Sequence, residues 1–281
     1  MKKSRINWSN IAYHVLMVLF SFLMLYPVLW MIFSSFKENE RIFATAHILI
    51  PEKWIIENYI EGWKGFGGTS FDVFFKNSLF YSGVGTIGTV ISSLMVAYGF
   101  SRVNFKGRNF WFACMMMTMM LPAQVVIIPQ FIMFHKFNWV NSFKPLIVPT
   151  FTAGPFFVFL IMQFIRGIPS ELDEAAKIDG CNKYEIFFRI IVPLVKPAII
   201  TTTIFSFYWK WDDFLGPLLY LNKPKLYTVS LALRAFNDAT TKTNWGGLLA
   251  MSTLSLVPVL IIFFAFQRYL VEGIATTGLK G

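Results

Sequence analysis

Charged residues are scarce in this sequence. Only 14% of its 281 residues are Asp, Glu, Lys or Arg, whereas 56% are hydrophobic and 18% are aromatic. Soluble domains typically carry about a quarter of their residues as charges. The composition therefore excludes an ordinary soluble domain and indicates a protein whose solvent is largely the lipid bilayer.

Cysteine and histidine are scarce as well. The two cysteines, Cys114 and Cys181, fall in an apolar segment and in a polar loop, which argues against a disulfide framework. The three histidines, His14, His47 and His135, are scattered along the chain. We therefore predict no metal site.

Catalytic signatures are missing too. The sequence has no Gly-Lys-Ser or Gly-Lys-Thr triplet, no nucleophile elbow and no His-Glu-x-x-His pattern. We therefore predict that the chain is not an enzyme and cannot be its own ATPase. Gly83, Gly85 and Gly88 match the dinucleotide fingerprint, but they lie within an apolar run. Gly85 with Thr89 and Gly88 with Ser92 place small residues four apart, so we expect these positions to let another helix approach closely.

Long uncharged runs are abundant. A helix needs about 20 residues to cross a hydrocarbon core of roughly 30 Å. Six segments qualify, although Lys210, Asp212 and Asp213 interrupt the fifth: 11–36, 77–101, 109–134, 146–165, 197–221 and 245–266. The first is too long for a signal peptide and lacks a cleavage site, so we expect it to be retained. We predict an all-α, polytopic membrane protein with six transmembrane helices, in which residues 1–281 form a single transmembrane domain.

Basic residues indicate the orientation. They gather before the first segment, in the link after the second and after the sixth, as Lys2, Lys3, Arg5, Arg102, Lys106, Arg108 and Arg268. The positive-inside rule then places both termini in the cytoplasm. This topology also accounts for the net charge of +10, and no basic stripe interleaved with aromatics indicates nucleic-acid binding.

The segment 169–196 is the most polar part of the predicted cytoplasmic face. Ser170 and Asp173 have the spacing of a helix cap, and the neighbouring acids suit the positive end of a helix. Gly180 suits the left-handed turn that ends a helix. We predict a first short helix between Ser170 and Gly180.

A second short helix follows. Asn182 and Glu185 have the spacing of a cap, and Pro193 should end the helix shortly after Ile190. Two such helices are suited to dock on a soluble partner through apolar residues set among charges, namely Leu172, Ala175, Ala176, Phe187 and Phe188. The alternative is an amphipathic loop that lies on lipid headgroups.

The same loop matches a known motif. Glu174-Ala175-Ala176 is followed after three residues by Gly180, and after nine more by Ile190, one residue and Val192-Pro193. This spacing resembles the EAA loop of binding-protein-dependent ABC importer permeases, with Val192 where that family usually has Leu. The resemblance implies a two-helix coupling loop that contacts the ATPase through Glu174, Ala175, Ala176, Asp179, Gly180, Ile190 and Pro193.

The resemblance extends over nearly the whole chain. The segments 51–59, 211–218 and 267–274, with the ending 278–281, resemble the carbohydrate-importing subfamily, in particular its second membrane subunit, the type found in the maltose transporter. The resemblance implies that the C-terminal tail reaches the ATPase through Gly278, Leu279, Lys280 and Gly281.

The resemblance also implies the assembly. The chain would form half of the pathway for a carbohydrate, with an oligosaccharide as the expected solute. A different permease subunit would complete the pathway, and two ATPase subunits would use ATP and Mg while this chain binds no cofactor. An extracytoplasmic binding protein would deliver the solute. The loops 37–76 and 222–244 are candidates for its docking surface, the second being the better one, but both could equally be simple surface loops. The expected location is a bacterial inner membrane.

Trp209, Trp211 and Asp212 are candidates for the solute path, because aromatic rings stack on sugars and a carboxylate accepts hydroxyl donors. Residues two apart lie about 200° apart around a helix, so the two tryptophans would not share a face. The alternative is an interfacial aromatic belt, with the partner permease supplying most solute contacts.

Other functions remain open. The solute could be something other than a sugar. An ion-driven secondary transporter is another class, but it would favour carboxylates at mid-membrane, and five of the six segments have no Asp or Glu. A structural scaffold without transport would not need the EAA spacing.

Overall fold

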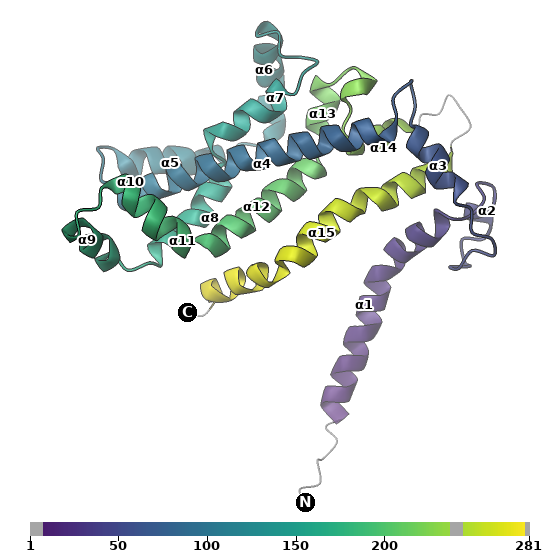
Figure 1. The fold of residues 1–281 in the computed structure, drawn as a ribbon, viewed down its shortest axis with the longest axis horizontal. Coiled ribbons are helices and arrows are strands. Elements are labelled where there is room, and N and C mark those ends of the chain that lie inside the picture. The colour runs from purple at the N-terminus through teal and green to yellow at the C-terminus, as the bar shows by residue number, and fades with distance from the viewer. Residues whose placement is uncertain (1–7, 237–243, 279–281) are drawn as a thin grey trace, which may run out of the picture. The chain divides into compact units, whose positions relative to one another are not determined.

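The computed structural model describes residues 8–236 and 244–278 (Figure 1). Within these ranges the chain is helical apart from connecting turns and one isolated bridge between Phe66 and Thr69. The prediction of an all-α chain is confirmed there. The chain divides into two compact units, which are Met1–Phe71 with Leu233–Leu256, and Asp72–Ala232 with Val257–Gly281.

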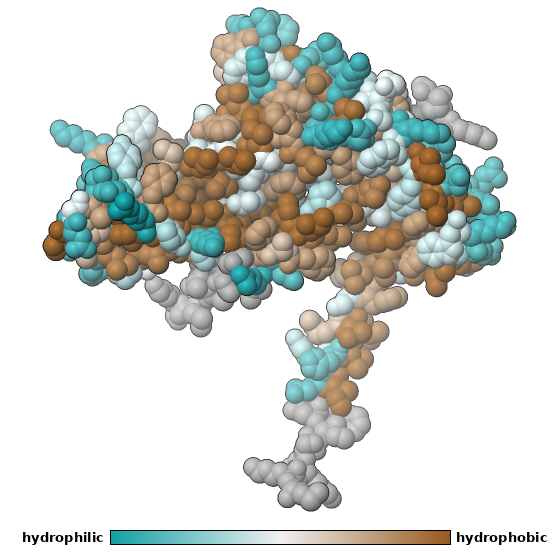
Figure 2. All heavy atoms as spheres, viewed as in Figure 1, coloured by the Kyte–Doolittle hydropathy of each residue, from teal (hydrophilic) through white to brown (hydrophobic). Residues whose placement is uncertain are grey.

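The first unit contains α1 (Trp8–Ser34), α2 (Arg41–Ala44), α3 (Glu57–Lys64) and the start of α15 (Trp245–Gly278). Helix α1 leaves its apolar side chains exposed along most of its length, which is visible as the brown stretch in Figure 2. An apolar helix that the chain does not cover needs an apolar solvent, so α1 suits a bilayer.

Asn58 fixes α3 to the end of α1. Its side-chain amide donates to the backbone carbonyls of Ser35 and Lys37, each at 2.8 Å. These carbonyls follow the last turn of α1, where no further helical N–H groups are available as hydrogen-bond donors. The hydroxyls of Ser35 and Tyr59 also lie 2.8 Å apart. Asn58 and Tyr59 therefore hold the loop after α1 in place.

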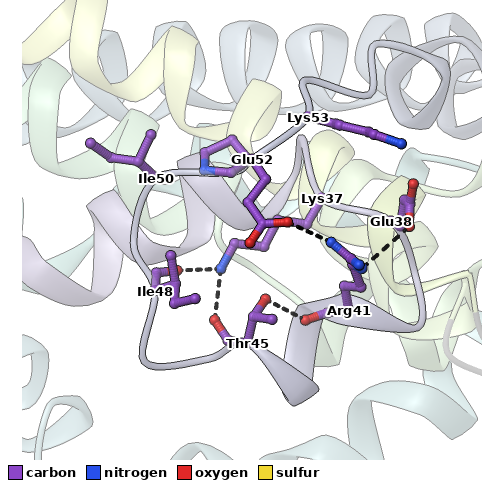
Figure 3. A pocket seen from close by; sticks show the side chains of 9 residues that line it. Lys37, Glu38, Arg41, Thr45, Ile48, Ile50, Glu52 and Lys53 are labelled. Atoms are coloured by element: carbon purple, nitrogen blue, oxygen red, sulfur yellow. Dashed lines mark hydrogen bonds and ion pairs between the residues drawn. The ribbon is translucent and has the colours of Figure 1, made fainter.

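That loop closes around the ammonium group of Lys37 (Figure 3). Lys37 is 4% exposed, and its Nζ donates to the carbonyls of Thr45 and Ile48. Arg41 pairs with Glu52 at 2.6 Å beside it. The cavity encloses about 20 Å³, which is room for roughly one water molecule and far too little for a sugar ring.

The second unit contains most of α4 (Phe71–Arg102), and its core packs α4 against α8 and α12 through residues that include Leu94, Val158, Ile161 and Ala198. The helices between α4 and α14 are α5 (Arg108–Thr118), α6 (Ala123–Lys136), α7 (Lys144–Ile147), η1 (Val148–Thr152), α8 (Pro155–Arg166), α9 (Glu171–Ile178), α10 (Lys183–Glu185), η2 (Ile186–Ile191), α11 (Val192–Leu194), α12 (Lys196–Trp211), α13 (Leu215–Tyr220) and η3 (Pro224–Leu226); α14 is Val229–Phe236.

Four described segments are long and apolar enough to cross a bilayer: Asn10–Ser34, Phe71–Arg102, Lys144–Arg166 and Trp245–Arg268. The pair Lys183–Leu194 and Lys196–Trp211 makes a fifth candidate, bent by 75°. These segments support a multi-pass membrane protein, and the count of six remains a prediction.

Two predicted segments are interrupted. In 109–134, α5 ends at Thr118 and α6 begins at Ala123, because Pro122 has no N–H to continue the helix. In 197–221, α12 ends at Trp211 and α13 begins at Leu215. The Asp213 carboxylate accepts the Gly216 N–H at 3.0 Å, so the side chain replaces a helical partner at this break.

The glycines of the dinucleotide-like pattern lie inside α4. A Cβ atom at Gly88 would lie 2.6 Å from Thr150 Oγ1 and 2.8 Å from the Phe151 ring, and one at Gly85 would lie 2.8 Å from the Lys210 side chain. These positions allow η1 and α12 to approach α4 closely. The prediction of helix packing is confirmed at Gly85 and Gly88.

Candidate functional site

Helix α9 ends in a glycine turn. Gly180 has a φ of +84°, its N–H donates to the Lys177 carbonyl at 3.0 Å, and the Cys181 N–H donates to the Ala176 carbonyl at 2.9 Å. These two bonds form a Schellman motif, whose left-handed position favours Gly. The prediction that Gly180 ends the first helix is confirmed.

The start of α9 differs from the prediction. Ser170 occupies the N-cap position, but its backbone is already helical and its side chain makes no capping hydrogen bond. Asp173, which is 7% exposed, lies instead against Arg102 of α4. The predicted cap at Ser170 is therefore wrong, because the Ser170 backbone is helical and the Asp173 carboxylate pairs with Arg102 instead.

The second short helix begins as predicted. The Asn182 side chain accepts from the N–H groups of Tyr184 and Glu185, each at 3.0 Å, and the Glu185 carboxylate accepts from the Asn182 N–H at 2.9 Å. This is a complete capping box.

The end of that helix differs. Helical conformation runs through the π-helical turn η2 and past Pro193 to Leu194, before the 75° bend into α12. Pro193 has no N–H to donate to the preceding turn, and the helix widens to the π-helical turn η2 just before it rather than ending there. The prediction that Pro193 ends the helix is wrong.

One side of the loop is packed into the second unit. Ala176, Ile186, Phe187, Ile191 and Val195 are buried in the same core as Ile161, Met162 and Ile165 of α8. Ala176 and Phe187, two of the predicted docking residues, therefore face inward. The loop and α8 therefore share one core.

The other side of the loop is exposed. Ile178 is 86% exposed, and it shares this surface with the predicted residues Glu174, Ala175 and Asp179. Tyr184, Phe188 and Leu172 are exposed large apolar side chains of the same loop. A group of exposed apolar side chains next to acids is typical of a protein contact surface. Sequence reasoning missed Ile178 and Tyr184, although Ile178 follows Glu174 by one helical turn.

Helix α12 has an exposed aromatic face. Trp209 is 48% exposed, and Phe205, Tyr208 and Asp212 are exposed at spacings of three and four residues from one another, which places them on one side of the helix. The rings of Phe156 and Phe157 of α8 lie 5.4 and 5.2 Å from Trp209. Phe205 and Tyr208 were not identified from the sequence.

Trp211 lies on the opposite side of α12. It is 6% exposed, and its ring lies 5.8 Å from Phe207 and 6.1 Å from Phe75. The structure therefore brings Trp209 and Asp212 to one face, as the helical spacing predicts, and separates Trp211 from them.

The other charges of this segment bind within the chain. Lys210 Nζ donates to the hydroxyls of Thr89 at 3.0 Å and Ser206 at 2.7 Å. The Tyr81 hydroxyl donates to the Asp213 carboxylate at 2.8 Å. These groups link α4 and α12 and leave Asp212 as the exposed carboxylate of the segment.

The remaining candidate positions are only partly described. Gly278 ends α15, and the predicted tail contacts Leu279, Lys280 and Gly281 lie outside the described residues. The loop 222–244 contains η3 and α14, and its residues 237–243 also lie outside them. Across 8–236 and 244–278, no group of His, Cys, Asp and Glu is placed to hold a metal ion.

Comparisons with known proteins agree on one family. Residues 88–276 match the model of the binding-protein-dependent transport system inner membrane component. The probable ABC transporter permease protein YurM of Bacillus subtilis is 33% identical over 99% of this chain and 92% of its own length. The arabinooligosaccharides transport system permease protein AraQ of Halalkalibacterium halodurans is 33% identical over 93% of both chains.

A solved structure shows the same fold. It is a bacterial ABC transporter involved in the import of the acidic polysaccharide alginate, with a TM-score of 0.82 over 96% of this chain and 99% of the other, at 20% identity. With the matching family model and the two relatives, this likeness leads to one conclusion. The chain belongs to the inner membrane permease components of binding-protein-dependent ABC transport systems.

Proposed function

We propose that the chain forms half of a membrane pathway that imports an oligosaccharide, delivered by an extracytoplasmic binding protein and driven by ATP hydrolysis in separate subunits. Family membership supports the permease role, and the relative named for arabinooligosaccharides supports the solute class. A second, different permease subunit completes the pathway, and the ATPase subunits use the ATP and Mg.

The observation that carries the proposal is the two-sided loop from α9 to α11. Its inner side shares a core with α8, and its outer side exposes Glu174, Ala175 and Ile178. When a docked ATPase subunit moves, a loop of this kind can move with it as a rigid body and displace the membrane helices that share its core. In this arrangement Glu174 faces polar or basic groups of the ATPase.

The proposed topology has six membrane segments and cytoplasmic termini, so that the coupling loop and the tail face the ATPase. The third segment combines α5 and α6, and the fifth contains α12. The single-domain organisation belongs to this proposal, with the two compact units as its parts.

The proposed solute surface is the exposed face of α12. Tyr208 and Trp209 offer rings for stacking on sugars, and the Asp212 carboxylate offers an acceptor for hydroxyl groups. An exposed carboxylate at the end of a membrane helix is costly in lipid, so Asp212 favours a water-filled path or a partner subunit over lipid.

The coupling role is tested on the reconstituted complex with its binding protein and candidate oligosaccharides. Ile178→Glu adds a charge to a side chain that the chain itself leaves exposed, so folding should not change. We expect saccharide-stimulated ATP hydrolysis to fall by about tenfold or more, whereas Ile178→Val, which keeps the apolar contact, retains it. Normal stimulation in Ile178→Glu would contradict the proposed docking surface.

A further inference from the structure

Arg102, the last residue of α4, joins three elements. Its Nε lies 3.1 Å from Asp173 Oδ2 of α9. Its Nη2 donates to the backbone carbonyls of Ile165 at 3.2 Å and Ile168 at 2.6 Å, at the end of α8. The Ile168 carbonyl lies beyond the last turn of α8, and the Ile165 carbonyl also accepts the Ile168 N–H at 3.1 Å. A guanidinium can serve several acceptors at once. One side chain therefore holds the corner between α8 and α9 against α4.

The ion pair is shielded from solvent. The side chains of Arg102 and Asp173 are 13% and 9% exposed, whereas each of the other ion pairs in the described ranges has at least one largely exposed side chain. Neither Asp173 Oδ1 nor Arg102 Nε has a hydrogen-bond partner among the described residues, so the 3.1 Å contact of Arg102 Nε with Asp173 Oδ2 is an ion pair without hydrogen-bond geometry. The Arg102 charge is thus the main compensation for the buried carboxylate, and the two groups should move together.

A second contact ties α4 to the other short helix. The Tyr98 ring lies 5.0 Å from the Phe187 ring, and its hydroxyl donates to the Lys183 carbonyl at 3.1 Å. Tyr98 and Arg102 are four residues apart, so they lie on one face of α4. This face contacts both helices of the loop.

We propose that Arg102 and Asp173 are positioning residues that make α4 move with the coupling loop during transport. The proposal rests on the proposed coupling role of the loop and deepens it. The resemblance implies only that the loop contacts the ATPase, and the chain connects the loop directly only to α8 and α12. The Arg102–Asp173 pair adds α4 to the helices that move with the loop. Helix α4 also contacts α12 through Thr89 and Lys210, so its displacement reaches the helix with the proposed solute surface.

The test separates positioning from stability. A single substitution would leave one buried charge unpaired, which destabilises a protein, whereas replacing both members with apolar residues is often tolerated. The variant is therefore Arg102→Met with Asp173→Leu, in the full complex in proteoliposomes. The measurement is the number of oligosaccharide molecules transported per ATP hydrolysed. Poor folding lowers transport and hydrolysis in proportion, so it leaves this ratio unchanged.

We expect the double variant to assemble and to show a ratio lower by about tenfold, within the range of coupling between contacting residues. Lys106→Met, which removes an exposed charge from the same link, should keep the wild-type ratio. A wild-type ratio in the double variant would overturn the inference. If Ile178→Glu loses saccharide-stimulated ATP hydrolysis while the double variant keeps the wild-type ratio, only this inference fails. If Ile178→Glu keeps normal stimulation, the proposed function of the loop fails.

Discussion

Trp209 and Trp211 lie on opposite sides of α12, with Trp209 exposed and Trp211 packed against Phe207 and Phe75. Substitution of each tryptophan should therefore change a different property. Trp209→Ala removes a ring from the proposed solute surface, so we expect the KM for oligosaccharide uptake to rise about fivefold, the value of one aromatic contact, with little change in thermal stability.

Trp211→Ala removes a buried ring, so we expect a loss of about 3 kcal/mol in stability and an unchanged KM for the protein that remains folded. Melting followed by size-exclusion chromatography measures the first effect, and uptake kinetics measure the second. An unchanged KM in Trp209→Ala would assign this face to lipid or to the partner permease.

Gly180 tests the turn after α9. A side chain here meets no atom within 4 Å, so the cost of substitution lies in the left-handed backbone. Asn tolerates that conformation, whereas Val is strained by about 1–2 kcal/mol. We expect Gly180→Val to lose saccharide-stimulated ATP hydrolysis and Gly180→Asn to retain more of it. Equal loss in both variants would show instead that the ATPase approaches too closely for any side chain.

The turn and the cap of the loop can be predicted from the sequence, because each depends on only a few neighbouring residues. The structure confirms both the helix-ending turn at Gly180 and the capping box of Asn182 and Glu185. Asp173 was misassigned because its partner, Arg102, lies on another helix and outside the reach of local patterns. The break before Ala123 was missed because the uncharged run continues through Pro122, so hydropathy alone could not locate it.

The capping box at Asn182 should control the stability of α10. Asn182→Ala removes the acceptor for the Tyr184 and Glu185 N–H groups, at a cost of about 1 kcal/mol. We expect faster hydrogen exchange at these two amides, whereas Asn182→Ser, which restores a cap, should exchange nearly as the wild type does. Unchanged exchange in Asn182→Ala would mean that tertiary packing alone holds the helix.

Lys37 should give the first unit an alkaline pH dependence. Burial lowers the pKa of Lys37 below its ordinary value, so the folded chain releases this proton at a lower pH than the unfolded chain. Between the lowered pKa and the ordinary one the unfolded state binds more protons, so this group's contribution to stability rises with pH. We expect the Tm difference between wild type and Lys37→Met to shift in favour of wild type as the pH rises toward the ordinary pKa of lysine. A Tm difference that stays constant with pH would contradict the lowered pKa of Lys37.

The most direct test of the account is uptake of labelled oligosaccharide by proteoliposomes that contain this chain, its partner permease and the ATPase subunits, with the binding protein outside. The account predicts accumulation that requires both ATP and the binding protein and that persists when ionophores collapse the ion gradients. Uptake that continues without ATP and stops with the ionophores would contradict it and would indicate an ion-driven carrier.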